Sequence, residues 1–138
     1  MDFFCTAAAL KEKGYTVFCF ACKEEAARYV EGLFCGDCIG FGDSETISQM
    51  QLYELLSAKN TVIDPKHPSA GKTFLEVAGD ALTTEYFFTS ANALTEDGIL
   101  VNLDGTGNRV AGSLFGHRKV LYSNFAPCFG VKISPKPV

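Results

Sequence analysis

The sequence lacks any long run of basic residues. Twelve Lys and Arg stand against sixteen Asp and Glu, which leaves a net charge of -4, so the electrostatic footprint of a nucleic-acid binder is missing. No stretch approaches the roughly 20 apolar residues that a membrane span needs, and the start lacks the basic-then-apolar order of a signal peptide. We therefore expect a cytoplasmic protein with no nucleic-acid partner and no membrane span.

Internal repeats, low-complexity segments and a linker to a second domain are also missing. The chain has 138 residues, of which 47% are hydrophobic and 20% charged. This length and composition are typical of a single folded domain that buries its own core. Neither a metal ion nor a disulfide is required for such a chain to fold.

Helical and strand patterns alternate along the chain. Apolar spacing predicts helices over 1–14 and 23–33, after Gly42 and around Phe74, whereas β-rich runs predict strands. The expected strands cover 15–21, 38–42, 61–63, 86–91 and 119–122, with a hairpin at Asp97-Gly98 and a short helix over 110–115. We expect an α/β fold with three layers, α/β/α, around a mainly parallel sheet. The nearly all-apolar run over 15–21 predicts a strand that is covered on both faces.

The first candidate site is Gly40-Phe-Gly-Asp-Ser-Glu-Thr46, which joins a buried strand to a helix. Gly40 and Gly42 allow a close backbone approach, and Ser44 and Thr46 add hydroxyls where helical N–H groups bind anions. The alternative is a tight turn in which Ser44 only caps the helix. A short Gly-x-Gly does not separate the two.

The second candidate site follows the apolar strand that ends near Ala91. Ser90 lies at the end of that strand and Asn92 just beyond it, where ligands bind in open α/β sheets. Glu96, between Leu94 and Ile99, is the best candidate for a catalytic carboxylate acting as base or nucleophile. Its alternative role is that of a solvated turn residue, which the spacing alone favours.

The third candidate site is the polar, glycine-rich segment from Asn102 to Arg109. Arg109 is suited to clamp a phosphate or carboxylate, and Asn102, Asp104 and Asn108 add donors and acceptors. Alternatively, Asp104 pairs with Arg109 and holds the loop. The density of polar residues in a loop favours the ligand role.

Two C-x-x-C pairs, Cys19 with Cys22 and Cys35 with Cys38, invite a zinc or redox interpretation. Cys19 falls inside an expected strand and Cys38 begins another, and free cysteine commonly behaves as a small buried hydrophobe. We therefore expect reduced, metal-free cysteines and no cofactor. His67 and His117 lack a patterned partner, so neither is assigned a catalytic role.

The three polar segments resemble those of the LUD family, which includes the C-type component of bacterial lactate-utilisation operons. The matching residues are Ile39-Gly-Phe-Gly-Asp-Ser-Glu-Thr46, Thr89-Ser-Ala-Asn-Ala-Leu-Thr-Glu-Asp-Gly98 and Asn102-Leu-Asp-Gly-Thr-Gly-Asn-Arg-Val-Ala111. The resemblance implies a fold related to the ribose-5-phosphate isomerase, glucosamine-phosphate deaminase and CoA-transferase group. It also implies oxidation of lactate to pyruvate with iron–sulfur oxidoreductase partners. Glu96-Asp97-Gly98 is similar to the nucleophilic glutamate motif of CoA transferases.

The C-terminal segment departs from this resemblance. We expect a LUD-type domain over 1–122 and an atypical tail over 123–138, where the C-terminal part of the domain is missing or replaced. Pro127, Pro135 and Pro137 should keep the tail from extending the sheet regularly, and an uncovered edge favours self-association into a homo-oligomer or marginal stability. The leading hypothesis is a protein of lactate metabolism that binds a small anionic metabolite. The alternatives are a non-catalytic assembly subunit and a truncated remnant.

Overall fold

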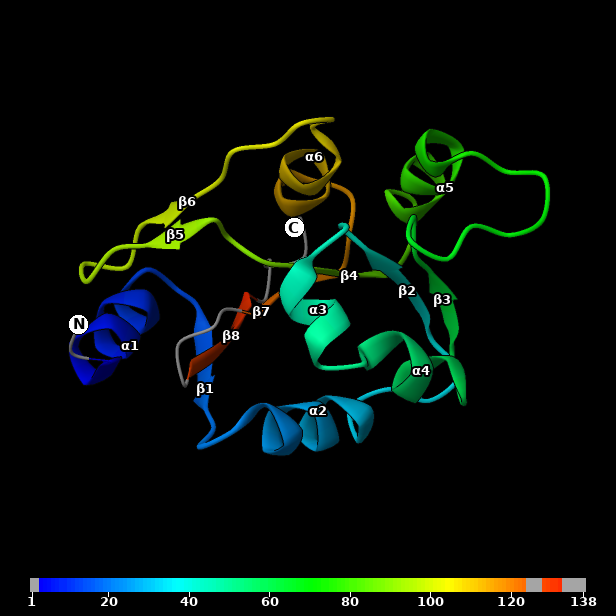
Figure 1. Ribbon diagram of the computed structural model, residues 1–138. Coiled ribbons are helices and arrows are strands. Elements are labelled where there is room, and N and C mark those ends of the chain that lie inside the picture. Colours follow the sequence, from blue (N-terminus) through cyan, green and yellow to red (C-terminus); the bar gives the residue numbers. More distant parts are fainter. Residues whose placement is uncertain (1–2, 124–127, 133–138) are drawn as a thin grey trace.

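The computed structural model describes residues 3–123 and 128–132. Helices and strands alternate over most of this chain (Figure 1). The elements are α1 (Phe3–Glu12), β1 (Thr16–Cys19), α2 (Lys23–Glu31), β2 (Cys38–Phe41), α3 (Glu45–Gln49), α4 (Leu52–Ser57), β3 (Thr61–Ile63), α5 (Phe74–Ala81), β4 (Tyr86–Thr89), β5 (Ala93–Leu94), β6 (Leu100–Val101), α6 (Asn108–Leu114), β7 (Lys119–Ser123) and β8 (Cys128–Lys132).

The main sheet has the strand order β1-β8-β7-β4-β2-β3. Four neighbouring strands, β7, β4, β2 and β3, are parallel, as the alternating pattern predicts. β8 is antiparallel to both of its neighbours, β7 and β1. A separate hairpin, β5 with β6, follows the parallel strand β4.

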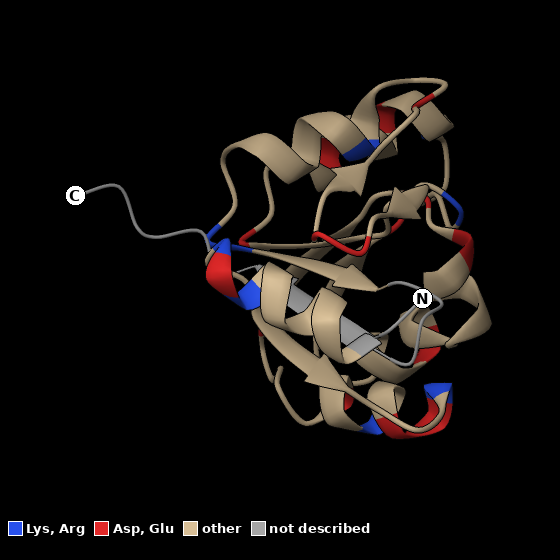
Figure 2. Ribbon diagram, turned by 90° about the vertical axis from the view of Figure 1, so that its left-hand side faces the viewer, with Lys and Arg blue, Asp and Glu red and all other residues tan. Residues whose placement is uncertain are grey.

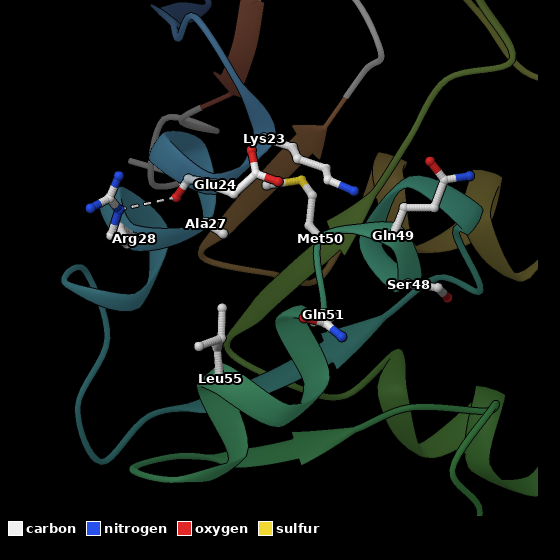
Figure 3. Close-up of a pocket in the computed structure, with 9 residues that line it drawn as sticks. All are labelled: Lys23, Glu24, Ala27, Arg28, Ser48, Gln49, Met50, Gln51 and Leu55. Carbon is white, nitrogen blue, oxygen red and sulfur yellow. Dashed lines mark hydrogen bonds between the residues drawn. The ribbon is translucent and has the colours of Figure 1, made fainter.

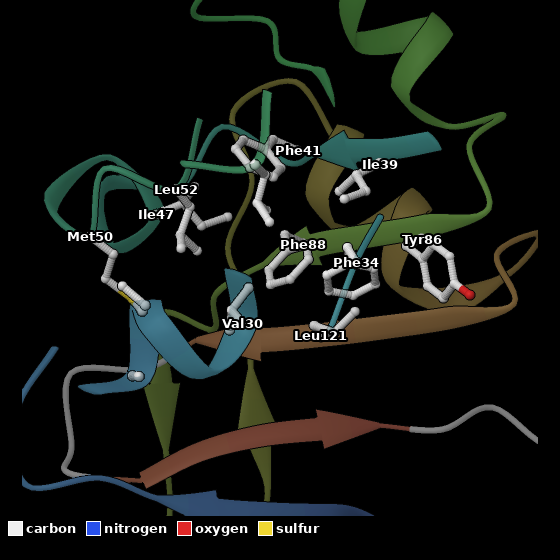
Figure 4. Close-up of a cluster of buried hydrophobic side chains, with 13 residues drawn as sticks. Val30, Phe34, Ile39, Phe41, Ile47, Met50, Leu52, Tyr86, Phe88 and Leu121 are labelled. Atoms are coloured by element: carbon white, nitrogen blue, oxygen red, sulfur yellow. The ribbon is translucent and has the colours of Figure 1, made fainter. Parts of the chain in front are cut away.

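Helices cover both faces of this sheet, so the predicted α/β class and three-layer arrangement are confirmed. α5 and α6 lie on one side of the parallel strands, and α2, α3 and α4 lie on the other (Figure 1). The core beneath the second group of helices contains Val30, Phe41, Leu52 and Phe88 (Figure 4), and a smaller core on the first side contains Phe87. Burial of these aromatic and aliphatic groups provides the main favourable term in folding.

Short polar motifs start the helices that follow the parallel strands. Ser44 is the N-cap of α3 and accepts a hydrogen bond from the Ile47 amide. The sequence alternative in which Ser44 caps the helix is therefore present. Thr73 caps α5 through a reciprocal capping box with Glu76, an arrangement that satisfies two amides that have no partner within the helix.

Two expectations about the sheet are wrong. β1 is not covered on both faces, because Thr16 and Cys19 are exposed while Val17 is buried. The tail does extend the sheet, since Cys128–Lys132 forms β8 between β7 and β1. Strand pairing requires backbone amides and carbonyls rather than a regular side-chain pattern, which is why composition did not reveal it. Pro127, Pro135 and Pro137 themselves lie outside the described residues.

Acidic and basic residues are interspersed over the helices and loops rather than gathered by sign (Figure 2). In the part of the chain that the structure describes, no helix has the length and apolar character needed to cross a membrane.

Candidate functional site

The loops that follow β2 and β4 meet at the carboxyl edge of the sheet. The two strands are parallel neighbours, with Phe41 opposite Phe88. Beyond them, the Ser44 hydroxyl donates a hydrogen bond to the Ser90 hydroxyl, with 2.8 Å between the oxygens. Both side chains are buried. The chain after β2 enters α3 on one face, whereas the chain after β4 enters the hairpin and α6 on the other side (Figure 1). Ligands of open α/β sheets bind outside the carboxyl ends of the strands, at this kind of edge.

The two candidate glycines permit close packing at this edge. A Cβ at Gly40 would lie 2.6 Å from Thr84 Oγ1 and closer still to the Ala81 carbonyl oxygen, so Gly40 allows β2 to pack against the end of α5. A Cβ at Gly42 would lie 3.1 Å from Arg109 Cγ. The Gly42 amide itself donates to the Phe88 carbonyl oxygen. Gly42 therefore brings the first and third candidate segments together.

Arg109 holds the loop that leads into α6. Its Nε donates to Asp104 Oδ1 at 2.7 Å, and one terminal nitrogen donates to Asn92 Oδ1 and to the Leu103 carbonyl oxygen. The other Asp104 oxygen accepts from the Val110 amide at 2.7 Å. The pairing of Asp104 with Arg109, one of the two sequence alternatives, is therefore present. These contacts fix the guanidinium within the loop and across to the segment after β4.

The remaining ligand candidates lie around this network. Asn92 Oδ1 also accepts from the Leu103 amide, and Asn108, the first residue of α6, accepts from the Thr106 hydroxyl. Asn102 is partly buried, and Thr46 is buried in α3. α3 has only five residues, so the partial positive charge at its start is small, because the helix dipole is a sum over aligned peptides.

Glu96 stands apart from these residues, in the turn of the β5–β6 hairpin. The hairpin base is closed by the Asn92 amide and the Val101 carbonyl, whereas Gly98 in the turn packs against Ala9 and Leu10 of α1. Four residues of extended chain span about 13 Å, so the exposed Glu96 carboxylate is well separated from the Arg109 network. The structure does not bring it together with Ser44 and Ser90.

Sequence reasoning missed a polar turn after β3, Asp64-Pro-Lys-His67. Asp64 is buried, and its Oδ2 lies 2.8 Å from His67 Nδ1. Lys66 Nζ lies 3.5 Å from Asp43 Oδ1 in the loop after β2, and 3.4 Å from Glu45 Oε2 and 3.0 Å from Ser48 Oγ in α3. The turn therefore adjoins the Gly42–Thr46 segment. An Asx-Pro sequence directly after a strand was the available signal.

His117 lies at the other end of the sheet, just before β7. It is buried, its Nδ1 donates to the Thr84 carbonyl oxygen at 2.6 Å, and its ring stacks on Phe87. Burial lowers the pKa of His117, although the bond to Thr84 acts in the opposite direction. This side chain belongs to the core and not to the carboxyl edge.

A hollow of about 490 Å³ opens between α2 and the turn from α3 to α4. Lys23, Glu24 and Arg28 line it from α2, and Gln49, Met50 and Gln51 line it from the opposite side (Figure 3). Hydrogen bonds to the start of α2 lower the pKa of Glu24. None of the residues that the sequence predicted as a site lines this hollow.

The cysteines differ from the sequence expectation in their exposure. Cys19, Cys22 and Cys35 are exposed and Cys38 is half-buried, so the small-buried-hydrophobe interpretation is wrong for this set. Cys19 does lie in β1 and Cys38 in β2. Among residues 3–123 and the strand β8, no group of three or more His, Cys, Asp and Glu side chains could hold a metal ion.

The fold and this edge define an α/β protein with polar side chains gathered at the carboxyl ends of its parallel strands. The family model of the LUD domain matches residues 6–122. The chain therefore belongs to the LUD domain family, which is associated with lactate-utilisation proteins. Comparisons with curated proteins and with solved structures gave no match.

Proposed function

We propose that this protein takes part in the utilisation of lactate or a related organic acid and binds a small anionic metabolite at the carboxyl edge of β2 and β4. Family membership supports the metabolic context. The hydrogen bond between Ser44 and Ser90 is the observation that supports this location, because it joins two buried hydroxyls from neighbouring segments. Hydroxyl groups can donate to a carboxylate once they no longer donate to each other.

The charged side chains around Ser44 and Ser90 favour a small ligand. Asp43 and Glu45 would repel an anion, but the Lys66 ammonium lies against both carboxylates and offsets them. Arg109 and Asp104 neutralise each other at 2.7 Å. Recognition then rests on hydroxyl, amide and backbone donors, which suit one carboxylate or one phosphate group rather than a polyanion.

Titration with L-lactate, pyruvate, inorganic phosphate and CoA tests this site. We expect lactate or pyruvate to raise the Tm of the protein, because a ligand that binds only the folded state stabilises it. Ser90→Ala should weaken that binding by about tenfold, the equivalent of one hydrogen bond to a charged group. Ser69→Ala, an exposed serine in the loop after β3, is the matched control. The location is refuted if none of the four compounds shifts Tm, or if both variants bind equally.

The proposed partners are iron–sulfur oxidoreductase subunits, which would accept the electrons of lactate oxidation. Glu96 remains the candidate catalytic carboxylate from the sequence, although it lies in the hairpin turn, apart from Ser44 and Ser90. Lactate oxidation by the purified complex should fall by about a hundredfold in Glu96→Gln if Glu96 transfers a proton, and an unchanged rate would exclude that role.

A second candidate function is that of a non-catalytic assembly subunit. Leu103, Leu114 and Phe115 are at least three-quarters exposed, and large exposed apolar side chains are common at protein interfaces. In this case Phe115→Ser should abolish co-purification with the iron–sulfur subunits, whereas Glu96→Gln should not alter the rate of the complex. Unchanged co-purification of Phe115→Ser would count against this alternative.

A further inference from the structure

The turn after β3 arranges a histidine and a buried aspartate in a defined geometry. Pro65 sets the backbone of a tight turn, in which the His67 amide donates to the Asp64 carbonyl oxygen at 2.9 Å. One carboxylate oxygen of Asp64 accepts from the Lys66 amide at 3.0 Å, and the other lies 2.8 Å from His67 Nδ1. Both oxygens of the buried carboxylate are therefore used, and the imidazole is held in one position.

This geometry fixes the tautomer of the ring. An ionised carboxylate only accepts hydrogen bonds, so His67 Nδ1 carries a proton and donates it to Asp64. In the neutral imidazole the lone pair then resides on Nε2. A carboxylate that orients a histidine in this way also stabilises the imidazolium that forms when Nε2 takes a proton.

The His67 ring is both supported and accessible. It stacks on Tyr53 of α4, with ring centroids 3.8 Å apart and an angle of 4° between the planes. The side chain of His67 is 43% exposed, whereas that of Asp64 is only 6% exposed. A buried acceptor behind a half-exposed imidazole is more than the turn itself requires, because the Asp64–His67 backbone bond already closes it.

The pair belongs to the same edge as the candidate site. Lys66, between Asp64 and His67, bridges to Asp43, Glu45 and Ser48, and Ser44 in that loop bonds to Ser90. The charged groups packed against the turn are thus Asp64 and Lys66 from its own loop and Asp43 and Glu45 from the loop after β2.

We propose that Asp64 and His67 form a proton-transfer pair that acts on a small 2-keto or 2-hydroxy carboxylate bound at this edge, with His67 as the proton-transferring residue and Asp64 as its positioning residue. The ligand class rests on the proposed function. The pair itself rests on the contacts of the turn.

Pyruvate allows the proton step to be written without an oxidant. The lone pair of His67 Nε2 takes a proton from the methyl carbon, the electrons of that C–H bond form the carbon–carbon double bond of the enolate, and the carbonyl electrons move to oxygen. In D2O the imidazolium exchanges its proton for a deuteron and returns it to carbon. The net result is replacement of methyl hydrogen by deuterium.

Exchange of pyruvate methyl protons in D2O, followed by proton NMR, measures this step. We expect the protein to accelerate exchange above the buffer rate. His67→Phe keeps an aromatic ring for Tyr53 and should reduce the added rate by about a hundredfold, the usual scale of general acid–base catalysis. Asp64→Asn presents an amide N–H to His67 Nδ1, moves the proton to Nε2 and should cost at least about tenfold by the same tautomer argument. Asp80→Asn, an exposed aspartate of α5, is the control.

A second measurement does not depend on any substrate. The chain has two histidines, and His117 is buried, so diethyl pyrocarbonate should modify one imidazole rapidly, and His67→Phe should abolish that reaction. Nitrogen-15 NMR of labelled protein should show a protonated Nδ1 in His67. An Nε2-protonated tautomer, or no exchange above the buffer rate, overturns the proton-transfer pair. If pyruvate still raises Tm in that case, the proposed function stands and only this inference fails.

Discussion

Replacement of Arg109 by alanine should destabilise the protein markedly, because Arg109 neutralises a buried carboxylate. The side chains of Arg109 and Asp104 are 15% and 7% exposed. Arg109→Ala removes three hydrogen bonds, and of the donors to Asp104 described above it leaves the Val110 amide. Removal of one partner of a buried ion pair costs about 3–5 kcal/mol. Because Arg109 is slightly exposed, we expect the lower end, about 3 kcal/mol.

Urea unfolding gives the free energy of unfolding for this comparison. The control is Arg118→Ala, since Arg118 pairs with Glu85 at 2.8 Å but both side chains are 41% exposed or more. Exposed pairs contribute little, so Arg118→Ala should be close to wild type. The double variant Arg109→Ala with Asp104→Ala should recover part of the lost stability, because it also removes the buried charge. Equal losses in the free energy of unfolding for Arg109→Ala and Arg118→Ala would refute the conclusion that Arg109 stabilises the loop before α6.

Two further predictions concern Gly40 and His117. Gly40→Ala should destabilise the protein by about 1–3 kcal/mol, because the added Cβ overpacks against Ala81 and Thr84. The control is Gly79→Ala, which should be neutral or stabilise by up to about 1 kcal/mol, since a Cβ there meets nothing within 4 Å. Similar urea midpoints for the two variants would contradict the packing argument. Burial lowers the pKa of His117 below its ordinary value of 6.5. The neutral His117 side chain therefore contributes its full stability above pH 6.5. This contribution is lost as the pH falls below 6.5, because the unfolded chain takes up the proton first. Urea unfolding at about pH 7.5 and about pH 5.5 should show a smaller loss in His117→Phe than in His67→Phe, and equal losses would oppose this assignment.

The order of elements was predictable from sequence because it depends on local periodicity. The strand over Thr61–Ile63 has the predicted bounds, and α6 and β7 begin within two residues of the prediction. The single helix expected after Gly42 is divided into α3 and α4 by Gln51, which adopts a left-handed φ of 54°. Such a conformation is uncommon for a residue other than glycine, so composition gave no sign of it.

The candidate site was predictable only where chemistry and position coincide in sequence. Ser44 and Ser90 were identified because each follows a strand that reads as buried, and the structure joins them. The link from Lys66 to Asp43 crosses between loops more than twenty residues apart, so no local pattern encodes it. No sequence pattern pairs His67 with another side chain, although its partner, Asp64, is only three residues away.

The packing at Gly42 connects Arg109 to the hydrogen-bonded pair of Ser44 and Ser90. Arg109 passes so close to Gly42 that a Cβ there would lie 3.1 Å from its Cγ and 3.0 Å from Phe87 Cζ. The segment between β2 and α3, which carries Ser44, and the start of α6, which carries Arg109, therefore share a contact that leaves no room for a side chain at Gly42. A shift of the loop before α6 must alter the position of the chain between Gly42 and Ser44, and through Ser44 the hydrogen bond to Ser90. In the proposed site, Arg109 would thus control ligand affinity by holding Ser44 and Ser90 in position, without contacting the ligand itself.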